Sequence, residues 1–100
     1  MRPYRLVTPA YRNLRDILDY LNSNSSSAAE RFLTTLDYRL RLLARYPESG
    51  MRRSEFGHPD LRYLSVDSYV IAYYPDTKPL TIVAIIHGSR DITEHLKDIR

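Results

Sequence analysis

The stretch at residues 80–87, LTIVAIIH, constrains the fold of this chain more than any other. Its first seven residues are apolar or β-branched, which is typical of a strand. Side chains alternate between the faces of a strand, so neither face of this one is polar. Alternation places Leu80, Ile82, Ala84 and Ile86 on one face and Thr81, Val83, Ile85 and His87 on the other. We therefore expect a central strand, with helices on one face and the other partly covered or offered to a partner.

The composition fits one domain, residues 1–100, with a modest core around that strand. Hydrophobic residues make up 43% of the chain and charged residues 27%, as in ordinary globular proteins. Cysteine is absent, which excludes disulfides and thiolate chemistry and fits a cytoplasmic location. No apolar run approaches the roughly 20 residues of a membrane span, and the start has no signal-peptide pattern. We expect no contact with a membrane.

The charged residues and histidines show no pattern of a metal or cofactor site, and the basic charge has two interpretations. Three histidines are scattered without zinc-binding spacing, so we expect no metal and no cofactor. The net charge is +3, and 13 of the 15 basic residues are arginine. Arginine offers a planar fork to carboxylates and phosphates. Two interpretations stay open: a solvated surface paired with the 12 acids, or a basic face for an acidic partner or nucleic acid.

The first half of the chain predicts a strand and two helices. Residues 4–8 read as a strand, and Thr8-Pro9 as a helix cap followed by proline at the first helical position. Apolar residues then recur at helical spacing over 9–22. After NSNSSS, Ser27-Ala-Ala-Glu30 predicts a capping box, and the helix it opens ends before Pro47. The polar turn between the helices predicts an antiparallel hairpin.

The second half predicts further strands and a short helix. Residues 51–56, 61–66 and 69–74 read as strands that precede the one at 80–87, with turn residues between them. Asp91 is positioned to cap a terminal helix. The predicted fold is α+β: an N-terminal strand, a two-helix antiparallel hairpin packed on a mainly antiparallel sheet, and a short C-terminal helix.

Several segments of the chain resemble one protein superfamily when they are taken in order. They are YRNLRDILDYL, AAERFLTTLDYRLRLLARYPESG, RRSEF, LRYLSVDSYVIAYY and the closing IIHGSRD. Together they resemble the RelE/ParE toxins of type II toxin–antitoxin systems, and the ParE branch most closely. The resemblance implies a toxin, as in plasmid stabilisation systems, held in a hetero-oligomeric complex by an acidic, ParD-like antitoxin. ParE-like toxins are associated with inhibition of DNA gyrase.

The resemblance also implies an alternative, because RelE-like toxins cleave messenger RNA on the ribosome. The residues for that chemistry would be Glu55, Arg62, His87, Arg90 and His95, with Glu55 and His87 as base and acid. No tyrosine follows Tyr74, and only two lysines occur, so the lysine-rich loop of several RelE nucleases is missing. We therefore favour a toxin that acts by binding over an enzyme.

Seven arginines and one histidine form two sets of candidate contact residues. Candidates for target binding are Arg52, Arg53, Arg62, His87 and Arg90, and candidates for antitoxin binding are Arg39, Arg41 and Arg45.

The motif HGSRD at 87–91 has two interpretations. In the structural one, His87 caps the strand end, Gly88 permits a bulge or a positive φ, and Arg90 pairs with a nearby acid. In the functional one, Arg90 and His87 lie beside Arg62 at one end of the sheet and form a polar patch for a partner.

Overall fold

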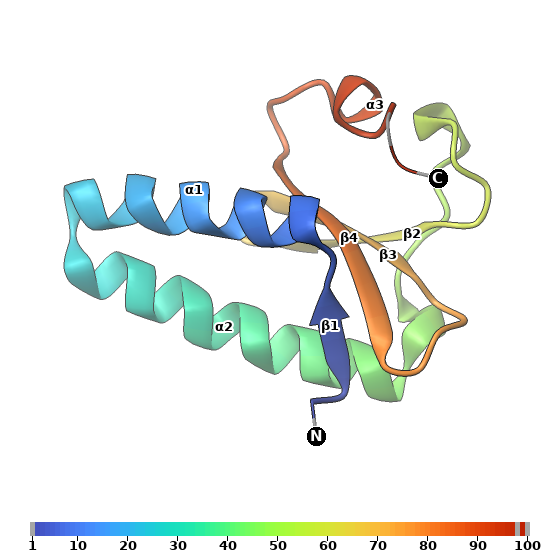
Figure 1. The fold of residues 1–100 in the computed structure, drawn as a ribbon, viewed down its shortest axis with the longest axis horizontal. Helices are drawn as coiled ribbons and strands as arrows, with labels where there is room; N and C mark the ends of the chain where they lie inside the picture. The colour runs from blue at the N-terminus through green and yellow to red at the C-terminus, as the bar shows by residue number, and fades with distance from the viewer. Residues whose placement is uncertain (1, 98, 100) are drawn as a thin grey trace.

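The computed structural model describes residues 2–97 and 99, and has a helical hairpin packed on a four-stranded sheet (Figure 1). This arrangement confirms the predicted α+β fold. The elements are β1 (Tyr4–Leu6), α1 (Thr8–Asn24), α2 (Ser26–Arg45), the 3₁₀ turns η1 (Pro47–Ser49) and η2 (Ser54–Phe56), β2 (Arg62–Val66), β3 (Tyr69–Tyr74), β4 (Leu80–His87) and α3 (Ile92–His95).

The sheet has the strand order β1-β4-β3-β2, so β4 is an internal strand, as predicted. The pairing of β1 with β4 is parallel, and β2–β3 and β3–β4 are antiparallel. His87 at the end of β4 pairs with Tyr69 of β3, and Tyr69 pairs with Val66 of β2. Arg62 lies at the other end of β2 and pairs with Tyr73. The register therefore places Arg62 and His87 at opposite ends of the sheet.

The predicted alternation along β4 was wrong because the strand contains a bulge. Ala72 of β3 pairs with Ala84, but the next residue, Tyr73, pairs with Ile82, which leaves Val83 without an opposite residue. A bulge of this kind interrupts the alternation of faces. Ile85 therefore joins Leu80 and Ile82 in the core beneath the hairpin, whereas Val83, Ala84 and Ile86 belong to the core on the opposite face.

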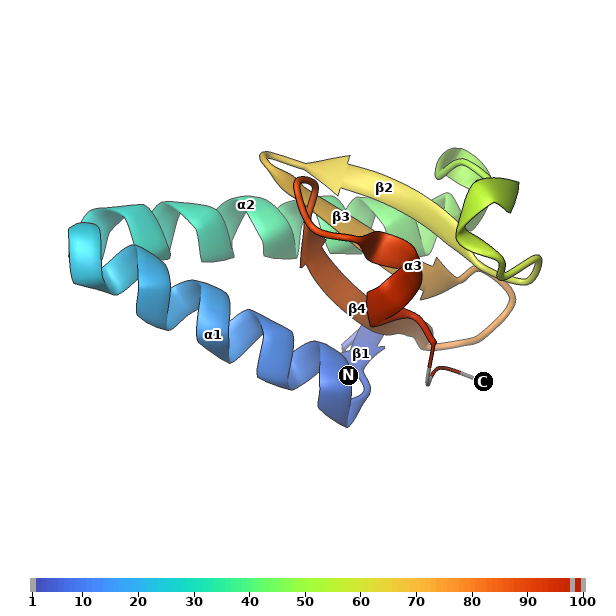
Figure 2. The ribbon, with the colours of Figure 1, turned by 90° about the horizontal axis from the view of Figure 1, so that it is seen from above.

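Each face of the sheet has its own hydrophobic cluster. Under the hairpin, Phe32, Leu36 and Leu40 of α2 pack with Ile17 of α1 and with Ile71 of β3. On the opposite face, α3, its C-cap Leu96 and the segment before β2 form the cover, in which Leu61, Ile92 and Leu96 pack on Tyr63 of β2. Figures 1 and 2 show that the hairpin extends past the sheet on the side where α1 and α2 connect.

The helix boundaries differ slightly from the predicted ones. α1 has Val7 as its N-cap, so Thr8 is already helical and Pro9 is the second residue. Ser25 alone separates the helices, and it is both the C-cap of α1 and the N-cap of α2. The predicted capping box at 27–30 was therefore wrong, because α2 begins at Ser26 and its N-cap accepts no side-chain capping bond.

Residues 51–56 do not form the predicted strand. Met51 makes one isolated bridge to Tyr63, with two backbone hydrogen bonds of 2.8 Å. The chain then turns into η2, which ends at Gly57 with a φ of 80°. Within this segment the Arg53 guanidinium donates to Glu55 at 2.8 Å. Residues two apart lie on the same face of a strand, so Arg53 and Glu55 could also have paired in the predicted strand. Local side-chain bonds of this kind are equally compatible with a turn, and here they form in one.

Candidate functional site

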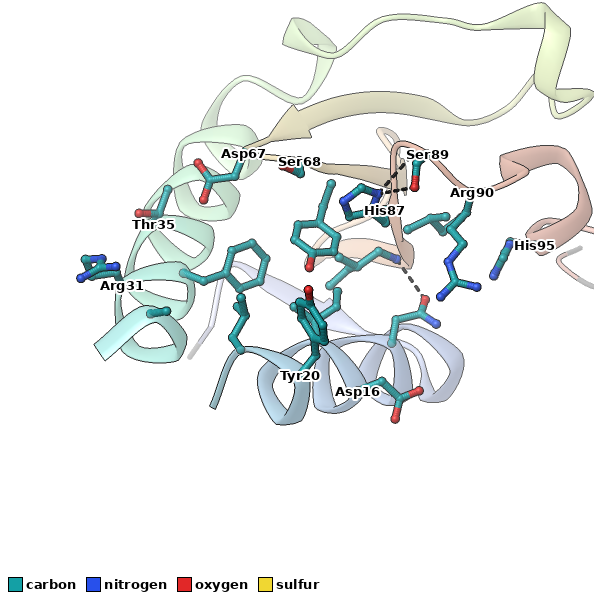
Figure 3. Close-up of a pocket in the computed structure, with 18 residues that line it drawn as sticks. Asp16, Tyr20, Arg31, Thr35, Asp67, Ser68, His87, Ser89, Arg90 and His95 are labelled. Carbon is teal, nitrogen blue, oxygen red and sulfur yellow. Dashed lines mark hydrogen bonds between the residues drawn. The ribbon is translucent and has the colours of Figure 1, made fainter. Parts of the chain in front are cut away.

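An open groove of about 1060 Å³ lies where the hairpin extends past the sheet (Figure 3). Its apolar lining includes Ile17, Phe32 and Ile85, with the ring of Tyr69. Its polar lining comes from both helices, the β2–β3 turn and the end of β4. It includes Asn13, Asp16, Tyr20, Arg31, Thr35, Asp67, Ser68, His87, Ser89, Arg90 and His95. A concave surface with an apolar base and a few converging polar groups is the usual form of a binding site.

His87 is held in one tautomer by the turn that follows β4. Its Nδ1 accepts a hydrogen bond from the Ser89 backbone N–H at 3.1 Å, and the Ser89 hydroxyl lies 2.8 Å from the same nitrogen. The ring meets Tyr69 edge-on, with centroids 5.2 Å apart. Because a backbone N–H can only donate, Nδ1 carries no proton in the neutral ring. The proton of neutral His87 therefore lies on Nε2, which is a hydrogen-bond donor.

His95 is held in the opposite tautomer. Its Nδ1 lies 3.0 Å from the Asp91 carbonyl oxygen. A carbonyl only accepts, so Nδ1 of His95 donates and Nε2 of the neutral ring is an acceptor. Asp91 is the N-cap of α3, and its side chain accepts from the Glu94 N–H at 3.1 Å, as predicted. The two imidazoles on the groove thus offer one donor and one acceptor.

Arg90 is presented to the groove by a tight turn (Figure 3). Its backbone N–H donates to the His87 carbonyl at 2.9 Å, and the Gly88 N–H donates to the Ser68 carbonyl at 2.8 Å. Among the residues that the structure describes, nothing makes a hydrogen bond or ion pair with the Arg90 guanidinium. The predicted pairing of Arg90 with a nearby acid was therefore wrong. The predicted positive φ at Gly88 was also wrong.

Asn13 supports the groove and was missed in the sequence. β1 ends at Leu6, so β4 has no strand partner on that side beyond Ile82. There the Ile85 N–H donates to the Asn13 side-chain oxygen at 3.0 Å. The sequence did carry a signal, because Asn13 follows Ala10 and precedes Ile17 at helical spacing, and both neighbours are buried. A polar residue at such a position needs a buried partner.

The other predicted target-binding residues do not line the groove. The Arg62 guanidinium donates to the carbonyls of Gly50 and Glu48, at 2.8 and 3.3 Å. Arg52 donates to the Pro59 carbonyl, and Arg53 binds Glu55 and lies over Phe56, 4.9 Å from its centroid. The predicted patch of Arg62 with His87 and Arg90 was wrong, because the strand register separates them. His87, Arg90 and His95 are the predicted residues that the groove brings together.

Glu55 does not meet the requirements of the predicted general base. The hydrogen bond from Arg53 lowers the pKa of Glu55. A general base works best when its pKa lies near the working pH, so this shift acts in the wrong direction. Glu55 is also absent from the groove that contains His87.

The three arginines of α2 have different environments. Arg39 donates to the Ser65 carbonyl at 3.2 Å, which fastens α2 to β2. Arg41 forms an ion pair with Asp37 at 2.9 Å. Arg45 lies over the ring of Tyr46, 5.8 Å from its centroid. Arg41 and Arg45 are exposed, and their contact with an antitoxin stays a prediction.

Comparison with known proteins agrees with the fold. No helix in the described residues is both long and apolar enough to cross a membrane, and no cluster of three metal-ligating side chains occurs among those residues. No curated protein matches the chain. Residues 4–92 match the family model described as the ParE toxin of the type II toxin–antitoxin system parDE. Because this match covers most of the chain, the protein belongs to the ParE family of type II toxins.

Proposed function

We propose that this ParE-family toxin inhibits DNA gyrase by binding, and that a ParD-like antitoxin neutralises it. Gyrase inhibition is the activity associated with ParE-like toxins, and the family match supports an antitoxin partner. One observation supports the groove as the target-binding surface. The Arg90 guanidinium lines the groove and has no ion-pair partner among the described residues. A guanidinium held by a rigid turn is well suited to a carboxylate on the target.

Binding is favoured over catalysis because the predicted catalytic set is dispersed. Arg62 is used to hold a backbone turn, and Glu55 is bound by Arg53. RNA cleavage needs an acid, a base and a cation around one phosphate. The predicted set of Glu55, Arg62 and His87 lacks that arrangement.

The direct test adds purified toxin to gyrase, relaxed plasmid and ATP, and follows supercoiling on gels. We expect supercoiling to be lost as toxin is added, and restored by prior mixing with the antitoxin. In cells, induction should trigger DNA-damage signalling while messages stay intact. Normal supercoiling at large toxin excess, with cells still arrested by the same protein, would contradict the proposal.

A second candidate function is RNA cleavage in the same groove, and one observation favours it. His87 and His95 present a donor and an acceptor nitrogen in their neutral forms, and Arg90 lines the groove with them. Such a pair matches the needs of general acid–base catalysis. Mapping RNA 5′ ends after induction tests it, with His87→Gln and His95→Gln as variants. Reproducible cuts within codons that disappear in both variants would favour this function over gyrase binding.

A further inference from the structure

Tyr20 is an exposed aromatic residue of the groove that holds no part of the fold together by hydrogen bonds. Its side chain is 65% exposed, and Figure 3 shows it reaching from α1 into the groove, toward the side on which His87 lies. Among the residues that the structure describes, none makes a hydrogen bond with its hydroxyl. Tyrosine is among the residues most often found as the anchor of a protein interface. The ring is therefore available to a partner, although Tyr20 was missed in the sequence.

Three hydrogen-bond donors gather where β4 ends. Arg90 has no ion-pair partner within the described part of the chain, and Nε2 of neutral His87 is a donor because Nδ1 accepts. The side-chain oxygen of Asn13 accepts from the Ile85 N–H at 3.0 Å, which leaves the amide N–H groups of Asn13 for a ligand. Ile85 lies two residues before His87, so all three donors border the last residues of β4 and the turn after it. We call Asn13, His87 and Arg90 the donor corner.

The wall that α1 contributes to the groove sets the spacing between the donor corner and Tyr20. Asn13, Asp16 and Tyr20 follow at steps of three and four residues, so they share one face of α1. Asn13 and Tyr20 lie about 10 Å apart along the helix, given a rise of about 1.5 Å per residue. Asp16 lies between them and has no ion-pair partner among the described residues. A ligand along this wall meets donors, an acid and an aromatic ring, in that order.

The charges of the groove favour a protein segment over a nucleic acid. The lining includes two aspartates, Asp16 and Asp67, as well as Arg31 and Arg90. A polyanion that entered the groove to reach Arg90 would bring further negative charge toward the aspartates, and like charges oppose association. A protein segment can instead offer one carboxylate to the donor corner and a basic side chain to Asp16. The groove therefore suits a ligand of mixed charge.

We infer that the groove binds a segment of gyrase in which a carboxylate and an apolar or aromatic side chain lie about 10 Å apart. The carboxylate accepts hydrogen bonds from the donor corner, the apolar side chain packs on the Tyr20 ring, and a basic residue between them faces Asp16. In an extended chain, with a rise of about 3.3 Å per residue, such side chains are about three residues apart. This inference rests on the proposed function and deepens it, because it adds Tyr20 and Asn13 as contact residues and gives the chemistry of the segment they recognise.

The first test measures binding of the toxin to gyrase in the absence of DNA, by calorimetry. Tyr20→Ala should weaken binding at least about tenfold, and Tyr20→Phe should recover most of that loss, because the ring makes the contact. Tyr11→Ala is the matched control. Tyr11 is also on α1 and is 54% exposed, but it does not line the groove, so this variant should bind as the wild type does.

Asn13→Asp separates contact with the target from support of the fold. Aspartate keeps an oxygen that can accept from the Ile85 N–H, but it replaces the amide donor with a negative oxygen in the donor corner. Asn13→Asp should therefore weaken gyrase binding at least about tenfold, while the midpoint of thermal unfolding stays near that of the wild type. Asn13→Ala removes both groups and should lower that midpoint, because the Ile85 N–H loses its acceptor.

Each result decides the question. Weakening by Tyr20→Ala and Asn13→Asp, with recovery in Tyr20→Phe, supports the inference, and the two Tyr20 variants decide it if Asn13→Asp is unfolded. Unchanged binding in both, or equal weakening by Tyr11→Ala, would overturn it and leave gyrase as the target. Tight binding of a short single-stranded oligonucleotide to the toxin alone, lost in Tyr20→Ala, would overturn it in favour of a nucleic acid. If the wild type neither binds nor inhibits gyrase, the proposed function fails, and the inference fails with it.

Discussion

At the scale of single residues, backbone hydrogen bonds decide what each side chain in the groove can offer. A backbone N–H turns His87 into a donor at Nε2, and a backbone carbonyl turns His95 into an acceptor there. The turn that positions His87 also orients Arg90, through the bond between the Arg90 N–H and the His87 carbonyl. The tautomers of the two histidines and the position of Arg90 are therefore set by hydrogen bonds to residues two to four positions away in the sequence.

The first residue-scale prediction concerns Arg90. Arg90→Ala should abolish toxicity and change the free energy of unfolding by less than about 0.5 kcal/mol, because the guanidinium is exposed and makes no described contact. Arg90→Lys should restore toxicity poorly, since one ammonium cannot replace a planar fork. Growth after induction, thermal unfolding and antitoxin binding should be measured on both. A fully toxic, normally stable Arg90→Ala protein would show that Arg90 is not needed for binding the target.

The second concerns Tyr4 and Asp37, which join β1 to α2 through a hydrogen bond of 2.5 Å. Burial, helped by this bond, raises the pKa of Tyr4 from 10.0 to about 12. The folded protein thus keeps a proton that the unfolded chain loses near pH 10. This stabilisation is complete below pH 10 and is lost as the pH rises towards about 12. Conversely, the bonds from Tyr4 and Arg41 lower the pKa of Asp37, so its contribution is lost as the pH falls below 3.8.

Tyr4→Phe should therefore flatten the decline of stability on the alkaline side. Urea unfolding at a series of pH values measures this, with Tyr38→Phe as the control because that ring is 65% exposed. If the wild type and Tyr4→Phe lose stability in parallel between pH 10 and about 12, the bond to Asp37 does not hold the phenol proton.

At the scale of elements, the turn between α2 and the sheet is built around one buried tyrosine. Tyr73 of β3 is fully buried, and its hydroxyl accepts from the Gly50 N–H at 3.0 Å and donates to the Pro47 carbonyl at 2.6 Å. Arg62 adds a bond to the Gly50 carbonyl. A Cβ on Gly50 would lie 2.3 Å from the Tyr73 hydroxyl and 2.9 Å from the Tyr63 carbonyl. This turn therefore needs glycine for space.

Gly50→Ala should accordingly destabilise the protein by more than about 2 kcal/mol, because the turn must shift and a buried hydroxyl loses its partner. Gly57→Ala is the matched control. Gly57 has a φ of 80° but nothing near the added methyl, so only the backbone conformation opposes it, by about 1 kcal/mol. Urea unfolding of both variants tests the difference. Equal, small losses would show that the turn around Tyr73 adapts easily.

At the scale of the whole molecule, the sheet is covered on both faces by segments from opposite ends of the chain. The hairpin covers one face, and α3 covers part of the other. The His58 side chain bonds the Leu96 carbonyl at 2.9 Å and links the cover before β2 to the C-terminal segment. This double cover explains why β4 is apolar on both faces. The groove lies between the hairpin, the β2–β3 turn and the end of β4.

Leu96 tests the importance of the second cover. It is fully buried in the cluster on that face, so Leu96→Ala should destabilise the protein by about 3 kcal/mol. Leu33→Ala, at a position that is 44% exposed, should lose less than about 1 kcal/mol. Thermal and urea unfolding of the two variants give the comparison. A small loss in Leu96→Ala would mean that the C-terminal segment contributes little to the folded state.

The sequence by itself determined the types and order of the helices and of β1 to β4, although residues 51–56 form a turn in place of a predicted strand. Apolar residues recur with a helical period in α1 and α2, proline at position 47 follows the end of α2, and β4 is apolar on both faces. These are local signals, since each depends on residues within a few positions of one another. Even the cap at Asp91 could be predicted in this way.

Only the tertiary structure decided which side chains meet. The bulge at Val83 arises from pairing with β3, and it reversed the predicted faces of Ile85 and Ile86. Register separated Arg62 from His87. Asn13 and Ile85, 72 positions apart, share a hydrogen bond at the groove. Contacts of this kind are selected by the free energy of the whole fold, so no local pattern records them.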